Sequence, residues 1–182
     1  MTRLPELTDR ESLPAEVQPV FDAIAESRGG IRGPFPWLLH SPPVAEQVGE
    51  LGHYLRFGSA LPDADREIAI ITAAREADCA YEFAAHARLA SSVGVADETI
   101  DAVAHRRDLD AFEPGAALVV RYARELLGDH RLSDETFAAA KERYGEQGVI
   151  DLTALCGYYT MVAAVLNAME ATPPADWPQL PA

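Results

Sequence analysis

Hydrophobic periodicity is the feature that most constrains the fold of this chain. Wherever a period can be recognised it is the helical one, as in "DREIAIITAARE", which places Ile68, Ile71 and Ala74 on one side of a helix. No run alternates apolar and polar residues cleanly enough to predict a half-buried strand. The sequence therefore predicts an all-α fold of about eight helices.

Helix boundaries follow from glycines, prolines and acidic residues at the expected ends. No linker divides the chain, so we expect one helical domain over 1–182, with a core of about 14–173 and a proline-rich tail over 172–182. A loop rich in glycine and proline should separate the first two helices. The expected helices run from near Pro14 to Gly29, and over 44–57, 61–78, 79–92, 97–105, 114–127, 134–144 and 148–170.

The last expected helix, "VIDLTALCGYYTMVAAVLNAM", is apolar almost all round. Such a helix is buried on every side, either at the centre of the domain or under another subunit. It carries Asp151, Thr153, Thr160 and Asn167, which argues against a membrane span. We favour a homo-oligomer whose interface includes this helix, and the tail should lie on the surface or along a neighbouring subunit.

Net charge limits the partners. The chain has 15 Lys and Arg against 29 Asp and Glu, a net charge of −14. A surface this acidic repels nucleic acids and anionic membranes, so neither is an expected partner. An anionic small-molecule substrate would need local arginines. Two cysteines and a polar N-terminus without a signal region favour a reducing, cytoplasmic location.

The stretch "CAYEFAAH" contains the best candidates for chemistry. Cys79, Glu82 and His86 are spaced by three and four residues, so they share one helical stripe. A carboxylate beside an imidazole fixes its tautomer and favours its charged form, which suits general acid–base catalysis. Glu67 could reach the same place if the helices pack side by side around Asp78. A solvated Glu–His pair and a small buried cysteine are the alternative interpretation.

These residues resemble the signature of the carboxymuconolactone decarboxylase family within the alkylhydroperoxidase D-like superfamily. The redox branch has the form E-x11-C-x2-C-x3-H, and Glu67, Cys79 and His86 match it, with Glu82 at the second cysteine position. "GPFPWLLHSPPVAEQVG" and "DLTALCGYYTMVAAVLNAM" also resemble the decarboxylase-like branch. The resemblance covers about 14–173 and implies an all-helical AhpD-like fold that assembles as trimers or hexamers.

The resemblance implies a carbon–carbon lyase of the 4-carboxymuconolactone decarboxylase type. It would act without a cofactor or metal on a small carboxylated lactone or a related enolisable metabolite. His86 would then transfer the proton, Glu82 or Glu67 would orient it, and Cys79 would donate a proton or line the pocket. The helix dipole should favour the Cys79 thiolate.

Two other functions remain open. A peroxide reductase could use Cys79 with an external thiol, although the usual dithiol is absent and Cys156 lies in an apolar helix. A non-catalytic, ligand-binding oligomer could retain the same residues as packing. For substrate binding we expect Arg32 in the glycine-rich loop, and also His40, Tyr81 and Arg75.

Overall fold

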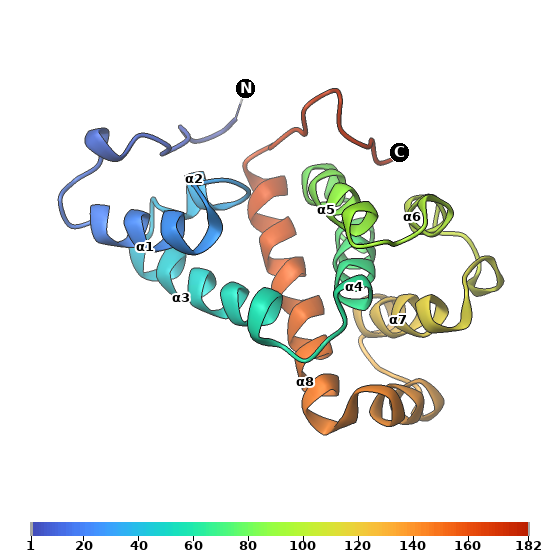
Figure 1. Cartoon of the computed structure of the whole chain (residues 1–182). Helices are drawn as coiled ribbons and strands as arrows, with labels where there is room; N and C mark the ends of the chain where they lie inside the picture. Colours follow the sequence, from blue (N-terminus) through green and yellow to red (C-terminus); the bar gives the residue numbers. More distant parts are fainter. Residues whose placement is uncertain (1, 182) are drawn as a thin grey trace.

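Eight α-helices form the framework of the computed structural model, which describes residues 2–181 (Figure 1). The described residues contain no β-strand, so the predicted all-α fold is confirmed. The eight helices are α1 (Gln18–Arg28), α2 (Phe35–Leu38), α3 (Pro42–His53), α4 (Asp63–Glu76), α5 (Ala80–Ser92), α6 (Asp97–Ala104), α7 (Pro114–Arg124) and α8 (Asp134–Ala168).

Two expected helices end in a wider turn than predicted. Helices α3 and α7 continue into π-helical turns over Tyr54–Gly58 and Glu125–Asp129, respectively. The expected loop between the first two helices contains the short α2, whose Phe35, Trp37 and Leu38 are buried. The two helices expected over 134–144 and 148–170 follow each other directly and together form α8. They are separated by a break at Gly145, where φ is 70°. Glycine adopts this left-handed φ without the clash of a Cβ atom.

The core forms around α4 and the C-terminal half of α8. Helix α4 packs against α5, α7 and α8, and every residue from Glu67 to Arg75 is buried. In Figure 1, α8 runs through the middle of the molecule, with α1 and α3 on one side and α4 to α7 on the other. Packing within one chain therefore covers much of α8.

The burial of α8 accounts for much of its apolar composition. It is the one helix of the described residues that is long and apolar enough to cross a membrane by composition, and 56% of its most apolar window is buried. A core helix is expected to have this property. Of the two alternatives expected for this helix, the structure shows the position at the centre of the domain. The subunit interface remains a prediction.

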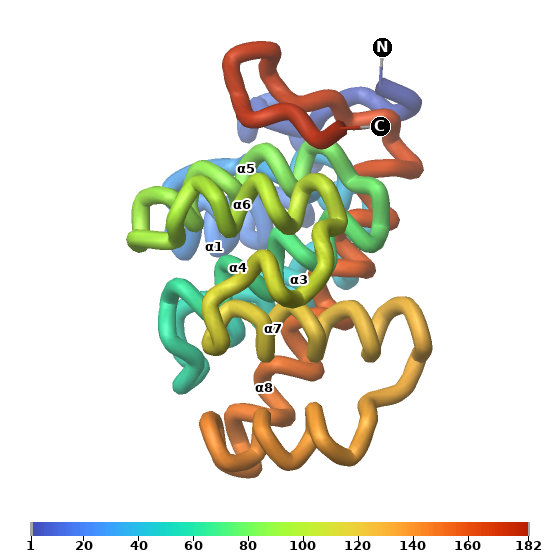
Figure 2. Tube along the Cα trace, turned by 90° about the vertical axis from the view of Figure 1, so that its right-hand side faces the viewer, coloured from blue at the N-terminus to red at the C-terminus, as the bar shows by residue number. Residues whose placement is uncertain are grey.

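Both ends of the described chain lie at the same end of the molecule. Figure 2 shows the N-terminal arm and the C-terminal tail close together there. They are joined by an ion pair of 2.6 Å between Arg3 Nη2 and Glu170 Oε1. The residues after α8 are not helical, as expected for the proline-rich tail. Residues 1 and 182, the limits of the expected domain, lie outside the described part.

Candidate active site

A tight connection between α4 and α5 brings the candidate residues together. Asp78 has a left-handed φ of 47°, and Cys79 is the N-cap residue of α5. Asp78 therefore does not cap α5. The Asp78 side chain instead accepts a hydrogen bond of 2.8 Å from Arg75 Nη1. The sharp reversal packs α5 against α4 along their lengths, so residues from the two helices face each other.

His86 lies between two glutamates, one from each helix. Its Nδ1 is 2.6 Å from Glu67 Oε2, and its Nε2 is 3.1 Å from Glu82 Oε1. The Tyr159 ring packs edge-on against the imidazole, with the ring centroids 4.9 Å apart. All four side chains are buried. The structure thus meets the geometric expectation that Glu67, Glu82 and His86 converge.

The charge of His86 follows from this geometry. Burial alone would lower the pKa of the imidazole, but hydrogen bonds to Glu67 and Glu82 outweigh it and raise the pKa from 6.5 to about 9. Each ring nitrogen can donate to its carboxylate only when both carry a proton. His86 is therefore an imidazolium at neutral pH, and it holds a proton directly beside Glu82.

The Glu82 and His86 side chains border a cavity of about 420 Å³. Most of the other lining side chains are aromatic or arginine, and they come from seven separate segments. They belong to α1, the loop before α2, α2 itself, the π turn, α5, α8 and the tail. The main ones are Arg28, Arg32, Phe35, Arg56, Phe57, Tyr81, Tyr158, Tyr159 and Trp177.

Three arginines line the cavity without a carboxylate partner. Arg28, Arg32 and Arg56 form no ion pair within the described residues, and Glu82 is the one acidic residue of the lining. The Nε atoms of Arg28 and Arg56 are buried and have no hydrogen-bond partner. In a chain of net charge −14, this is a local concentration of positive charge. Such a lining favours an anionic ligand.

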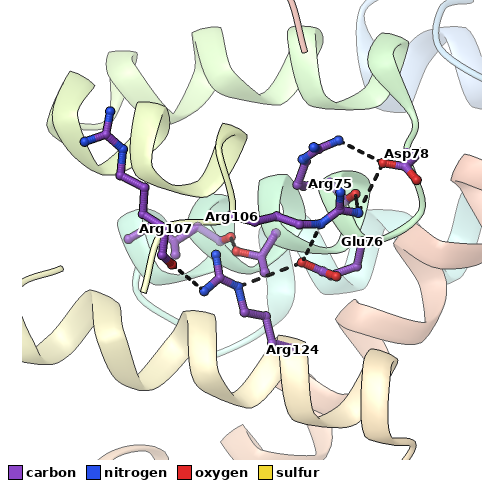
Figure 3. A network of polar contacts seen from close by, with 8 residues as sticks. Arg75, Glu76, Asp78, Arg106, Arg107 and Arg124 are labelled. Atoms are coloured by element: carbon purple, nitrogen blue, oxygen red, sulfur yellow. Dashed lines mark hydrogen bonds and ion pairs between the residues drawn. The ribbon is translucent and has the colours of Figure 1, made fainter. Parts of the chain in front are cut away.

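Two of the expected substrate-binding residues lie elsewhere. Arg75 belongs to a separate polar network, in which it and Arg106 both contact Asp78, and Arg106 and Arg124 lie close to Glu76 (Figure 3). His40 Nε2 is 2.9 Å from the carbonyl oxygen of Pro5. The structure places neither Arg75 nor His40 at the cavity, whereas it places Arg32 and Tyr81 there.

Cys79 differs from its expectation in two respects. Its side chain is fully buried and does not line the cavity. Burial raises the pKa of the thiol to about 11, so the expected stabilisation of the thiolate by the helix dipole is wrong. Desolvation of the charged form outweighs the helix terminus here. Cys156 is likewise buried, with the pKa of its thiol raised to about 12, and both cysteines are free.

Sequence reasoning missed several residues of the cavity. Arg28, Arg56 and Trp177 lie far from "CAYEFAAH" in the chain, and no fixed spacing connects them to it. One sequence feature could have drawn attention to Arg56. It lies in "YLRFG", a short segment at the end of α3 that contains two aromatic residues and ends in a glycine. π-helical turns are frequent at functional sites.

The comparisons agree with this fold. Residues 42–125 match the family described as the carboxymuconolactone decarboxylase family, a segment that contains Glu67, Cys79, Glu82 and His86. No functionally curated protein shows significant sequence similarity to the chain. The three solved structures described next are at most 17% identical to it in sequence, so they show the fold alone.

Three of these structures cover almost the whole chain. The first is an alkylhydroperoxidase AhpD core, an uncharacterized peroxidase-related protein from Ralstonia eutropha JMP134, with a TM-score of 0.76, 17% identity and coverage of 96% of this chain and 93% of that one. The second is an uncharacterized peroxidase-related protein from Silicibacter sp. TM1040, with a TM-score of 0.75, 15% identity and coverage of 96% and 95%. The third is the debrominase Bmp8 in complex with 2,3,4-tribromopyrrole, with a TM-score of 0.70, 16% identity and coverage of 96% and 95%.

The fold defines the chain as an all-α protein with the AhpD-like fold. The match over residues 42–125 supports the carboxymuconolactone decarboxylase/AhpD-like family. The same fold occurs in peroxidase-related proteins and in a debrominase, so the particular reaction has to be argued from the site.

Proposed function

We propose that the chain is an acid–base enzyme acting on a small anionic, enolisable molecule, with decarboxylation of a carboxylated lactone as the model reaction. The observation that supports this is the Glu67–His86–Glu82 group at the edge of a cavity lined by unpaired arginines. The group can store and transfer a proton, and the arginines can hold the negative charge of the substrate.

Glu82 is the side chain of this group best suited to exchange a proton with the substrate. Both nitrogens of His86 are occupied by carboxylates, so the imidazole has no free position. Glu82 Oε2 makes no hydrogen bond within the described residues, and Glu82 lines the cavity. This refines the role first expected for His86, which becomes the proton reservoir, while Glu67 holds its Nδ1–H.

The model reaction can be balanced with these groups. The bond between the substrate carbon and its carboxylate breaks, CO₂ leaves, and the electron pair remains as an enolate. His86 Nε2–H passes its proton to the Glu82 carboxylate, and Glu82 gives that proton to the carbon. One proton from solvent restores His86, so a carboxylate and a proton become a C–H bond and CO₂.

Positive charge in the cavity favours this reaction class. Arg28 and Arg56 are half-buried, and the buried Nε of each lacks a partner. A carboxylate or an enolate oxygen between them would gain charge-assisted hydrogen bonds, and these strengthen as charge develops on the enolate. Arg32 is exposed and donates to the Gly29 carbonyl oxygen, so it is better placed to attract the substrate at the entrance.

A thiol-dependent peroxide reductase is the less favoured alternative. The reacting species would be a thiolate, but the pKa of Cys79 is raised to about 11 by burial. The thiol also lies outside the cavity lining. A non-catalytic oligomer that binds a ligand remains the third candidate, because the same cavity could hold an anion without reacting.

Proton exchange tests the proposal directly. The wild-type chain would be incubated in D₂O with a panel of carboxylated lactones and β-keto acids, and deuterium incorporation and CO₂ release would be followed by NMR and mass spectrometry. Glu82→Gln and His86→Gln should each reduce the rate by a factor of about 10² to 10⁴. If the wild-type chain exchanges no carbon-bound proton and releases no CO₂ from any member, the acid–base proposal is wrong.

A further inference from the structure

The C-terminal tail forms a wall of the candidate active site. After α8 the chain continues without helix over 170–181, and Figures 1 and 2 show it passing above α5. These residues lie outside the segment 42–125 that matches the family. The tail therefore adds to the cavity a wall from outside the matched segment.

Trp177 is the tail residue that reaches the cavity. Its indole ring lies 4.7 Å from the Arg88 guanidinium and 6.0 Å from the Tyr81 ring, at a tilt of 55°. Arg88 and Tyr81 both belong to α5, the helix that also carries Glu82 and His86. Trp177 lines the same cavity as these two residues. One indole thus contacts the reactive helix and encloses the space beside it.

Aromatic and apolar contacts hold the tail in place. Its hydrogen bonds beyond Ala171 are internal, from Trp177 N to the Pro174 carbonyl oxygen and from the Gln179 side chain to Pro174 and Trp177. No hydrogen bond or ion pair joins residues 172–181 to a helix in the described structure. Four prolines in the tail restrict its alternative conformations, which lowers the entropy lost when Trp177 docks. Trp177 is therefore both the anchor of the tail and a surface of the cavity.

The cavity combines flat apolar surfaces with positive charge. Aromatic rings prefer offset or edge-on packing against other π systems, so they favour a planar conjugated ligand over a puckered saturated one. The guanidinium groups of Arg28 and Arg56 can bind the carboxylate of such a ligand. The aromatic side chains of the lining are Phe35, Phe57, Tyr81, Tyr158, Tyr159 and Trp177.

We propose that Trp177 is a specificity-determining residue of this site, and that it selects planar, conjugated carboxylates. The proposal rests on the proposed function for the nature of the reaction, but it concerns binding alone. Removing the indole would open the cavity at the tail and remove one aromatic surface. The preference for a conjugated ligand over a saturated ligand of equal charge should then decrease.

Benzoate and cyclohexanecarboxylate form a matched pair of probes, because they share a charge and a six-membered ring but differ in planarity. Their dissociation constants would be measured by calorimetry for the wild type, Trp177→Ala and Trp177→Phe. We expect the wild type to bind benzoate about threefold to tenfold more tightly. Trp177→Ala should show a clearly smaller preference than the wild type, and Trp177→Phe should retain much of the preference.

Fluorescence provides the matched control. The chain has two tryptophans, so Trp37→Phe leaves Trp177 as the sole indole. Benzoate should change the tryptophan fluorescence of Trp37→Phe and leave that of Trp177→Phe unchanged. Trp37→Phe should also keep the preference for benzoate over cyclohexanecarboxylate. Thermal unfolding would verify that each variant is folded, because Trp37 is buried and Trp177 is half-buried.

Several results would overturn the proposal. These are equal affinities for the two probes in the wild type, no binding of either probe, or an unchanged preference in folded Trp177→Ala. The proposed function is tested separately, because binding of the probes does not require that the protein catalyse a reaction. If the chain preferred benzoate through Trp177 but exchanged no carbon-bound proton with any substrate, only the acid–base proposal would be rejected.

Discussion

Glu67 Oε2 and His86 Nδ1 lie 2.6 Å apart although the two residues are separated by 19 positions in the sequence. Both side chains are buried, so the hydrogen bond between them is shielded from water and counter-ions. His86 also contacts Glu82, which makes one imidazolium shared by two carboxylates. The acid–base properties of the site therefore depend on Glu67, a residue that does not itself line the cavity.

The Glu67→Gln variant should lower the pKa of His86 from about 9 toward its ordinary value of 6.5. The amide removes a negative charge and a strong acceptor, which lessens the stabilisation of the imidazolium. The measurement is an NMR titration of the His86 ring. Asp101→Asn is the control, because Asp101 pairs with the exposed His105 instead. A pKa of His86 that stays near 9 in Glu67→Gln would contradict this account.

Stability should fall as the pH rises through 9. Folding raises the pKa of His86 from 6.5 to about 9. The contribution of His86 protonation to the free energy of unfolding is therefore complete below pH 6.5 and is lost above pH 9. The contribution is on the order of 3 kcal/mol. Urea unfolding at pH 6, 8 and 10 measures it, with His86→Gln as the reference for all other titrating groups. Parallel pH profiles for the two proteins would rule it out.

The Arg56→Met variant should weaken benzoate binding about tenfold to a hundredfold, the value of a charge-assisted hydrogen bond. Thermal stability should be nearly unchanged, because Arg56 has no ion pair to lose and its Nε already lacks a partner. Calorimetry and thermal unfolding check both points. The control is Arg107→Met, which removes an exposed arginine paired with Asp101 outside the cavity. Equal benzoate affinity in the two variants would refute a role for Arg56.

Gly52→Ala should destabilise the fold by about 1–3 kcal/mol. A Cβ at this position of α3 would overlap the Tyr158 hydroxyl and come within 2.5 Å of Arg28 Nη2. Tyr158 cannot move freely, because its hydroxyl donates to the Val48 carbonyl oxygen at 3.0 Å. Gly157→Ala is the matched control: nothing lies within 4 Å, so this helical position should tolerate or gain from alanine. Similar denaturation midpoints would contradict the prediction.

The Cys79 thiol should resist alkylation in the native state. It is buried, and the raised pKa of about 11 leaves little thiolate at neutral pH. Iodoacetamide at pH 7.5 should modify it only after unfolding, as followed by intact mass, and Cys79→Ala should retain proton-exchange activity. Rapid native modification that abolishes peroxide turnover would instead support the reductase alternative.

The sequence predicted those parts of the site that local spacing determines. Glu82 and His86 are four residues apart on one helix, so their contact follows from helical geometry. Glu67 was included on the condition that the two helices joined at Asp78 pack side by side, which they do. The Cys79 thiol was misjudged, because a helix position gives no measure of burial and burial dominates the pKa.

Apart from Arg32 and Tyr81, the sequence did not predict the walls of the cavity. Arg28 ends α1, Arg56 lies in a π turn and Trp177 is in the tail, so their meeting depends on tertiary packing that no single period encodes. The π turn itself was predicted as ordinary helix, since the hydrophobic pattern of five residues cannot distinguish the two. Arg75 was expected among the substrate-binding residues, yet it contacts Asp78.

The distribution of the site over the chain separates two kinds of evolutionary change. The residues proposed to transfer the proton lie on α4 and α5, whereas Arg28, Arg56 and Trp177 come from segments on either side of that pair. Substitutions in the outer segments can therefore alter which molecule is accepted while the helical pair that moves the proton stays intact. Descendants of one ancestral scaffold could acquire new substrates by this route without rebuilding their reaction chemistry.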